Sequence, residues 1–284
     1  MTGRFIAACI QNSADVELVP SLDVAERLIR QAAGENARLI CLPEYFASLD
    51  VVNDLLVSRA LPEEGHPALL RCRRLAEELG VWLLLGSLGI EDGGGKMLNR
   101  SYLLDARGGI VARYDKIHLF DVRLPNGEDY TESLTVAPGG EAVVAATPWG
   151  PLGLSICYDL RFPQLYHALA QAGALYLATP AAFTRTTGEA HWHVLQRARA
   201  IETGSYVLAP CQTGTHVGGR ASYGHSLIVD PWGRVLADGG EDVGFITAVI
   251  DPAEVAAARA RIPALRHARA FRPPHLAPMR AAGE

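Results

Sequence analysis

One stretch of the sequence restricts the fold more than any other: residues 152–163, LGLSICYDLRFP. Its first half is apolar and partly β-branched, the residues from Tyr158 to Phe162 interrupt that pattern, and Pro163 suits the first position of a helix. The stretch therefore predicts a buried strand, a sharp turn and a helix, with Cys157 at the carboxyl end of the strand. In open α/β sheets ligands bind at that edge, because loops and helix amino termini converge there.

Two interpretations of Cys157 are open at this point. A buried core cysteine is among the most common fates of this residue type, and a nucleophile at a sheet edge is the alternative. The five cysteines, at positions 9, 41, 72, 157 and 211, are odd in number and contain no C-x-x-C pair. This spacing disfavours both a disulfide framework and a zinc knuckle, so we expect free thiols.

Length, composition and charge exclude several classes of protein. A chain of 284 residues with 49% hydrophobic residues suits a sizeable α/β core, and no linker divides it, so we expect one domain over residues 1–284. The net charge of −5 and the scattered arginines argue against a nucleic-acid partner. No apolar run is long enough for a signal-peptide core or a membrane span, so we expect a cytoplasmic protein without a membrane partner.

Hydrophobic periodicity predicts an alternation of strands and helices along the chain. We expect strands at 5–10, 38–42, 81–87, 99–105, 110–114, 152–157, 174–179, 205–210, 223–230 and 245–250, and helices at 21–33, 50–60, 67–80, 163–172 and 188–203. Residues 121–140 read as a long loop, and long ordered loops are usually functional. The tail from about residue 253, rich in Ala, Arg and Pro, is predicted to be an extended arm.

Lysine is rare in this chain, and its rarity is informative. Only two of the 26 basic residues are lysines, Lys96 and Lys116. Arginine therefore serves wherever a general surface charge is sufficient, and a lysine is more often present for its compact, movable ammonium group. Lys96 follows a run of glycines typical of an exposed turn, whereas Lys116 directly follows an apolar strand.

Three polar residues share one predicted position. Glu44, Lys116 and Cys157 each lie at or just past the carboxyl end of an apolar strand, and they would meet at one edge if those strands were neighbours in one sheet. A thiol needs a base and a nearby positive charge to act as a nucleophile. Glu44 would supply the base, Lys116 the charge, and the N–H of Tyr158 an oxyanion contact. This chemistry requires no metal and no organic cofactor.

Five motifs together resemble those of the nitrilase, or carbon–nitrogen hydrolase, superfamily. They are LPEYF at 42–46, DKIHLFD at 115–121, GLSICYDLRFPQLY at 153–166, AAFTRTTGEAHWHVLQRARAIE at 181–202 and SYGHSLIVDPWG at 222–233. The resemblance implies a four-layer α-β-β-α sandwich that forms a homodimer or higher homo-oligomer through its helices. It also implies a catalytic triad of Glu44, Lys116 and Cys157, assisted by Glu132 in the loop after the lysine. Phe183, in the fourth motif, is expected in the substrate pocket.

The run from residue 187 to residue 226 resembles the deaminated-glutathione amidase branch of this superfamily more than the ω-amidase branch. The implied activity is that of a cysteine-dependent amidase that cleaves a terminal carboxamide of a small acidic metabolite and releases ammonia. Deaminated glutathione is the favoured substrate; ω-amides of 2-oxo acids, N-carbamoyl amino acids and nitriles remain open. A binding protein without activity on the same fold is a further alternative. Arg123 and Gln164 depart from the pattern of the family near the site.

Other polar residues near these motifs have two interpretations each. Arg161, just after the Cys157 turn, could bind a substrate carboxylate through its fork of donors or form a surface salt bridge. His191 and His193 are spaced i, i+2 and so point to different sides of a helix, which favours structural roles and no metal site. His118 and His225 could orient polar groups at the mouth of the site or be satisfied buried histidines.

Overall fold

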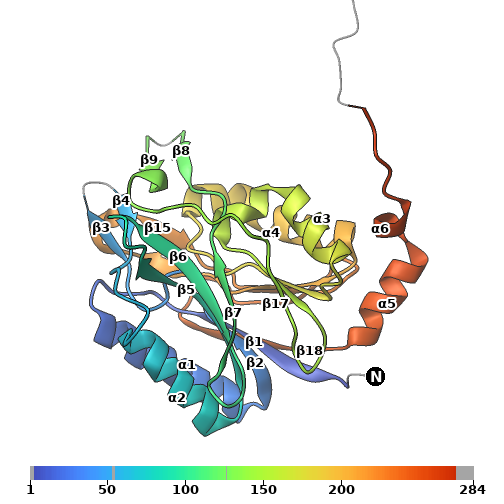
Figure 1. Cartoon of the computed structure of the whole chain (residues 1–284), viewed down its shortest axis with the longest axis horizontal. Coiled ribbons are helices and arrows are strands. Elements are labelled where there is room, and N and C mark those ends of the chain that lie inside the picture. Colours follow the sequence, from blue (N-terminus) through green and yellow to red (C-terminus); the bar gives the residue numbers. More distant parts are fainter. Residues whose placement is uncertain (1–2, 53–54, 126, 273–284) are drawn as a thin grey trace, which may run out of the picture.

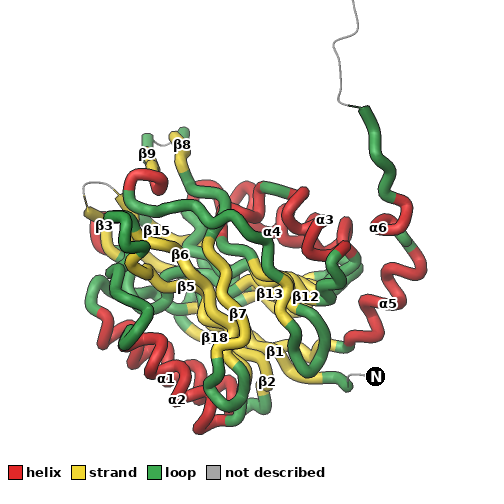
Figure 2. Tube along the Cα trace, viewed as in Figure 1, coloured by secondary structure: helices red, strands yellow, loops and turns green. Residues whose placement is uncertain are grey.

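Two six-stranded sheets form the body of the protein in a computed structural model that describes residues 3–52, 55–125 and 127–272. The sheets pack face to face, with helices on both outer faces, so the chain forms the expected α-β-β-α sandwich (Figures 1 and 2). The first sheet has the order β18 (Gly244–Ile250), β1 (Phe5–Gln11), β2 (Ala37–Cys41), β5 (Trp82–Glu91), β6 (Met97–Leu104) and β7 (Ile110–Asp115). The second has the order β10 (Val144–Ala145), β11 (Leu152–Leu154), β12 (Tyr176–Ala178), β13 (Tyr206–Ala209), β16 (Leu227–Val229) and β17 (Val235–Asp238).

The first sheet is buried on both faces, which explains why its strands read as continuous apolar runs. In β1, Ala7 and Cys9 belong to the core between the sheets, whereas Ala8 and Ile10 face the core beneath the outer helices. These helices are α1 (Leu18–Gly34) and α2 (Pro67–Leu79). Since side chains alternate across a strand, each residue of β1 is assigned to one of two cores by its position alone.

The second sheet is covered by α3 (Pro163–Gln171) and α4 (Arg185–Thr203). Pro163 is at the first position of α3, as predicted from the sequence, and Gly204 ends α4 in a left-handed conformation with φ of 58°. Among the described helices, none is long and apolar enough to cross a bilayer.

Short hairpins and turns gather at one end of the sandwich (Figure 1). The hairpins are β3 (Asp50–Val52) with β4 (Leu55–Val57), β8 (Asp121–Arg123) with β9 (Asp129–Thr131), and β14 (Thr213–Thr215) with β15 (Ala221–Tyr223). Three 3₁₀ turns, Glu132–Leu134, Cys157–Arg161 and Val217–Gly219, accompany them.

Two local predictions at this end need correction. The helix expected over residues 50–60 is wrong, because β3 and β4 pair there as an antiparallel hairpin around residues 53 and 54, which lie outside the described residues. The β-branched valines of this segment favour a strand. The predicted loop over 121–140 contains the β8–β9 hairpin before it reaches Glu132.

The carboxyl-terminal segment begins as a helix, so the predicted extended arm is wrong for its first part. Helix α5 (Pro252–Arg261) starts at Asp251, whose carboxylate accepts a hydrogen bond from Ala253 N, and α6 (Ala264–His267) follows. A capping aspartate, proline at the first position and a run of alanine and arginine all favour a helix. The described residues after α6 extend away from the body (Figure 1).

Candidate active site

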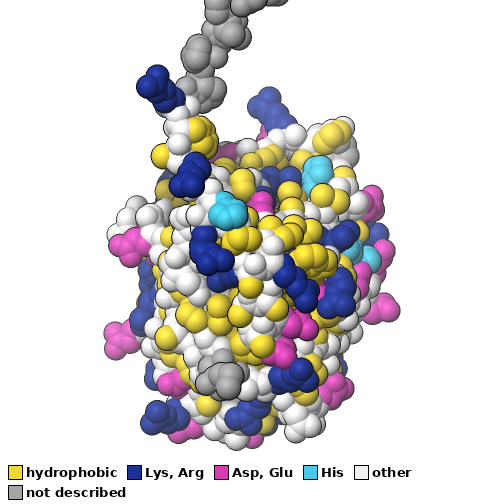
Figure 3. All heavy atoms as spheres, turned by 90° about the vertical axis from the view of Figure 1, so that its right-hand side faces the viewer, with side chains coloured by type: hydrophobic (Ala, Val, Ile, Leu, Met, Phe, Trp, Pro, Cys, Tyr) yellow, Lys and Arg dark blue, Asp and Glu magenta, His cyan; other side chains and the backbone are white. Residues whose placement is uncertain are grey.

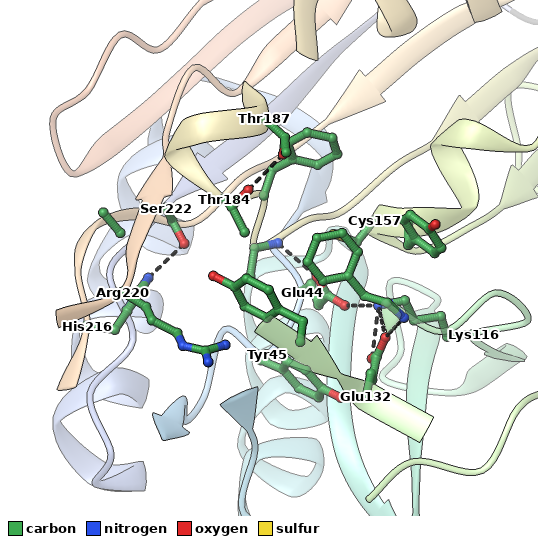
Figure 4. A pocket seen from close by; sticks show the side chains of 16 residues that line it. Glu44, Tyr45, Lys116, Glu132, Cys157, Thr184, Thr187, His216, Arg220 and Ser222 are labelled. Carbon is green, nitrogen blue, oxygen red and sulfur yellow. Dashed lines mark hydrogen bonds and ion pairs between the residues drawn. The ribbon is translucent and has the colours of Figure 1, made fainter. Parts of the chain in front are cut away.

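One pocket at the hairpin end of the sandwich brings together the three predicted strand-end residues, Glu44, Lys116 and Cys157 (Figure 4). Glu44 follows β2 and Lys116 follows β7, both in the first sheet, whereas Cys157 follows β11 in the second. The expectation of one sheet edge therefore needs correction. The residues meet because the strand ends of two facing sheets lie against each other.

Lys116 is the centre of a buried charge cluster. Its Nζ donates hydrogen bonds of 2.9 Å to Glu44 Oε1 and to both carboxylate oxygens of Glu132. The Lys116 and Glu44 side chains are only 2% and 3% exposed. Burial alone would lower the pKa of Lys116, but the charges of Glu132 and Glu44 outweigh it and raise the pKa above its ordinary value. The lysine is therefore a fixed positive charge.

The two carboxylates are positioned by further donors. Glu44 Oε2 accepts a hydrogen bond of 2.8 Å from Ala182 N, and Glu132 Oε2 accepts one of 2.7 Å from Phe120 N. Asn99 Nδ2 donates to Glu44 Oε1 at 2.9 Å and to Glu132 Oε1 at 3.3 Å. Asn99 thus links both carboxylates, and nothing in its sequence context predicted this role.

Cys157 has a constrained backbone at the start of its 3₁₀ turn. Its φ is 48°, in the left-handed region that a non-glycine residue seldom adopts, and its N–H donates to Pro180 O at 2.9 Å. Such strain at a strand-to-helix turn is typical of an exposed nucleophile elbow. The turn places the side chain where it lines the pocket and also borders the core between the sheets.

The thiol of Cys157 is neutral in this setting. Burial raises its pKa well above the ordinary value, and the negative charge of Glu44 and a hydrogen bond to that carboxylate add to the rise, whereas Lys116 opposes it. A cysteine held as a preformed thiolate would need the opposite balance. Glu44 and Cys157 line the same pocket, so a base lies on the same pocket wall as a protonated thiol.

A buried carboxylate holds the Cys157 turn from behind. Asp159 accepts hydrogen bonds from Ile156 N at 2.8 Å, His118 N at 3.0 Å and Tyr114 Oη at 2.6 Å. The imidazole of His118 also lies 2.7 Å from this carboxylate. His118 is therefore part of the support of the turn, which is one of the two roles its position suggested.

The predicted substrate contacts fall into two groups. Tyr158 and Phe183 line the pocket, and the ring of Tyr158 packs edge-on against Phe120. Arg161 is not among the described residues that line it. Its guanidinium lies 5.5 Å from the ring centre of Phe183 and 3.3 Å from His191 Nδ1.

Sequence reasoning missed Arg220, which does line the pocket. It follows the 3₁₀ turn Val217–Gly219 and lies 4.0 Å above the ring centre of Tyr130, with Nη2 donating to Asp129 O at 3.0 Å. One of 24 arginines carries no individual signal, although Arg220 lies within residues 187–226, the run that resembles one branch of the family.

The histidine pair on α4 divides between two sites outside the pocket. His191 contacts Arg161, whereas His193 joins His225 on the carboxylate of Asp238, at 3.0 and 2.9 Å. In the described part of the chain, His193, His225 and Asp238 form the one group of three metal-ligand side chains, with ligand atoms within 4.8 Å of one another. The two histidines of this group share the carboxylate of Asp238, so His193, unlike His191, does have a histidine and a carboxylate beside it.

Residues 6–260 match the carbon–nitrogen hydrolase family. The chain belongs to this family. A relative from Synechocystis, named deaminated glutathione amidase, is 42% identical over 267 residues, which cover 93% of this chain and 97% of the relative. The human protein of the same name is 42% identical over 274 residues, covering 93% of this chain and 82% of its own length. This family membership makes the protein an amide-hydrolysing enzyme.

Solved structures of family members agree with the fold. The Caenorhabditis elegans NitFhit protein superposes with a TM-score of 0.85 at 37% identity over 94% of this chain, which spans 66% of that longer protein. Saccharomyces cerevisiae Nit3, of branch 10 of the nitrilase superfamily, superposes with a TM-score of 0.80 at 29% identity over 92% of this chain and 95% of its own. The sandwich is thus the common architecture of the family.

Proposed function

We propose that the protein hydrolyses the amide bond of a small acidic metabolite through a thioester on Cys157. One observation supports this most: Glu44 is ion-paired with Lys116 at 2.9 Å, and both line one pocket with the Cys157 thiol. A nucleophile, a base and a fixed positive charge are the parts that covalent amide hydrolysis needs. Neither formation of the thioester nor its hydrolysis requires a metal or an organic cofactor.

In the first half of the reaction, Cys157 Sγ attacks the amide carbonyl carbon while Glu44 takes the thiol proton. The raised pKa of the thiol keeps that proton in place until the substrate is bound. The negative oxygen of the tetrahedral intermediate is stabilised by the charge of Lys116 and by the N–H of Tyr158, near the start of a turn where N–H groups have no intrahelical acceptor.

The intermediate collapses when Glu44 returns the proton to the leaving nitrogen, which breaks the carbon–nitrogen bond and leaves the acyl group on sulfur. A water molecule then loses a proton to Glu44 as it attacks the thioester, and the acid and the free thiol are released. Glu132 is assigned a positioning role, because both of its carboxylate oxygens accept hydrogen bonds from Lys116 Nζ.

Deaminated glutathione is the substrate that we favour, since relatives at 42% identity carry its name. Both amide bonds of glutathione are secondary, and deamination leaves them intact, so cleavage of either releases an amine. Ammonia, the product expected from the sequence, would accompany ω-amides of 2-oxo acids and N-carbamoyl amino acids, the second candidates. The leaving group therefore identifies the substrate class.

The test is turnover of a panel containing deaminated glutathione, 2-oxoglutaramate, N-carbamoyl-β-alanine and a simple nitrile, with amine and ammonia measured separately. Cys157→Ala should abolish turnover and leave the circular dichroism spectrum unchanged. Cys72→Ala is the matched control, because Cys72 is also a buried free thiol but lies in α2. Full activity in Cys157→Ala would refute the mechanism.

A binding protein without activity on the same fold is the alternative from another class. Buried charges are costly to retain, and a binder has no need of a buried base, lysine and thiol together. Intact-mass detection of an acyl adduct that disappears in Cys157→Ala separates the two classes. No adduct and no product from any panel member would favour the binder.

We also propose that the protein is a homodimer or higher homo-oligomer in which α4 contributes to the contact. Val194 and Ile201 are 66% and 53% exposed and lie seven residues apart on this helix, which places them on one face. Apolar side chains also gather, among arginines, on the face that carries α5 and α6 (Figure 3). Sedimentation of Val194→Glu/Ile201→Glu, expected to shift toward the monomer, tests this contact.

A cytoplasmic location is proposed as well. The five cysteines are all free and buried, which suits a reducing compartment. Fractionation of cells that produce the tagged chain tests the location.

A further inference from the structure

The pocket contains two arginine or lysine side chains among its described lining residues, Lys116 and Arg220. Lys116 has three N–H donors, and Glu44 and Glu132 accept hydrogen bonds from all of them. His216 also lines the pocket, but burial lowers its pKa below the ordinary value, so the imidazole is neutral at physiological pH. Arg220 is therefore the cation that faces a ligand in this pocket.

Arg220 is held in place by the β8–β9 hairpin. Two of its contacts come from this hairpin: the ring centre of Tyr130 lies 4.0 Å from the guanidinium, and Nη2 donates to the carbonyl oxygen of Asp129 at 3.0 Å. Figure 4 shows the guanidinium pointing toward the space between the labelled side chains, on the side away from Lys116. A planar guanidinium fixed in this way is pre-organised to bind a carboxylate with two parallel hydrogen bonds.

The charges of the pocket make such a contact necessary for an anionic substrate. Glu44 and Glu132 repel a second carboxylate near Cys157, and the walls between are aromatic, from Phe120, Tyr130 and Phe183. A carboxylate that loses water against aromatic walls is unfavourable unless it is paired. Arg220 is the group that can pair with it.

We propose that Arg220 binds a carboxylate of the substrate and so makes the enzyme select acidic amides over neutral ones. This proposal rests on the proposed function of the same pocket. It assigns to Arg220 the role that the sequence suggested for Arg161, which is not among the described lining residues and whose guanidinium contacts His191. The substrate then spans the pocket, with its scissile carbonyl at Cys157 and its carboxylate at Arg220.

The test compares kcat and KM of Arg220→Gln and Arg220→Lys on acidic and neutral amides. Deaminated glutathione and 2-oxoglutaramate are the acidic substrates, and pentanamide is the neutral one. Arg220→Gln should raise KM for the better acidic substrate about 10- to 100-fold and leave pentanamide unchanged. Arg220→Lys should recover part of this loss, because it restores the charge without the fork.

The control variant is Arg123→Gln. Arg123 lies on the same hairpin and contacts Asp129, but its side chain is 89% exposed, so no change is expected on either substrate. A second experiment measures binding and does not depend on turnover. Glutarate is titrated by calorimetry into Cys157→Ala and into Cys157→Ala/Arg220→Gln. The double variant should bind glutarate at least 10-fold more weakly than the single variant.

The role of Arg220 would be overturned if Arg220→Gln raised KM equally for acidic and neutral amides, or did not raise it for the acidic substrate. The amidase mechanism would still stand in either case. Failure of the mechanism gives a different result, namely that Cys157→Ala retains turnover or that the wild-type enzyme cleaves no panel member.

Discussion

Glu132 presents both of its carboxylate oxygens to the ammonium of Lys116, at 2.9 Å each, from a loop that lies 16 residues further along the chain. Glu44 contacts the same ammonium from the other side. Burial raises the pKa of Glu132, and Lys116 partly offsets this rise. The lysine is thus held by two carboxyl groups, and all three side chains line the pocket together with Cys157.

Replacing Glu132 by Gln should lower kcat about 100-fold with little change in melting temperature. The amide is nearly isosteric, but its neutral oxygen no longer raises the pKa of Lys116 or restrains its ammonium. Steady-state kinetics on the preferred amide measure this effect. Glu141→Gln, at an exposed position in the following loop, is the control. An unchanged kcat in Glu132→Gln would contradict the positioning role.

Glu44→Gln should have opposite effects on thiol reactivity and on turnover. The charge of Glu44 adds to the rise of the Cys157 pKa and Lys116 lowers it, so removal of the carboxylate should lower that pKa and increase the thiolate fraction at any pH below it. We expect faster alkylation by iodoacetamide at pH 8 together with loss of amide hydrolysis.

Peptide mass spectrometry over pH 7–10 gives the alkylation rate at each cysteine. Cys211 is an internal control in the same molecule, because burial raises its pKa to about 12 and it should remain unlabelled. Slower alkylation of Cys157 in Glu44→Gln would show that the carboxylate favours the thiolate, contrary to the proposed balance.

Asp159→Ala should destabilise the fold by about 3 kcal/mol, because it leaves three buried donors without an acceptor. It should also lower kcat, since the Cys157 turn loses its support. Urea denaturation measures the free energy of unfolding. Asp92→Ala is the matched control, because Asp92 accepts similar hydrogen bonds from Gly94 N and Lys96 N in an exposed turn. This variant should lower the free energy of unfolding by much less than Asp159→Ala. An equal loss of free energy of unfolding in the two variants would show that burial of the Asp159 donors does not determine the effect.

The fold was largely predictable because its signals are local. Apolar runs correctly predicted the strands near residues 5–10 and 245–250. Pro67 and Gly80 correctly predicted the two ends of α2. The helix predicted over residues 50–60 was wrong because the apolar residues there fit the period of a helix as well as that of a strand. Only the pairing of β3 with β4 decides between the two.

The site residues that lie at the ends of strands could be predicted from the sequence. Those that gain their role from tertiary contacts could not. Glu44, Lys116 and Cys157 stand out in the sequence, but their meeting depends on how two sheets face each other. Asn99 and Arg220 gain their roles from side chains that are distant in sequence. Asp159 did leave a local signal, because it lies three residues after Ile156 and accepts from its N–H, as a capping carboxylate does.

Gly86 determines where the Glu44 segment can lie. A Cβ atom at this position in β5 would overlap the carbonyl oxygens of Leu42 and Pro43, which are backbone atoms and cannot turn aside. Gly86→Ala should therefore displace Glu44 from Lys116 and lower kcat at least 100-fold, with a loss of roughly 3 kcal/mol in stability.

The control for Gly86→Ala is Gly34→Ala, at the end of α1. A Cβ there meets no atom within 4 Å, so the variant should be neutral or more stable by up to about 1 kcal/mol. Kinetics and urea denaturation of both variants separate a displaced base from a general loss of fold, because a displaced base lowers kcat in the fraction that remains folded. Wild-type kcat per folded molecule in Gly86→Ala would show that the close approach to Pro43 does not position Glu44.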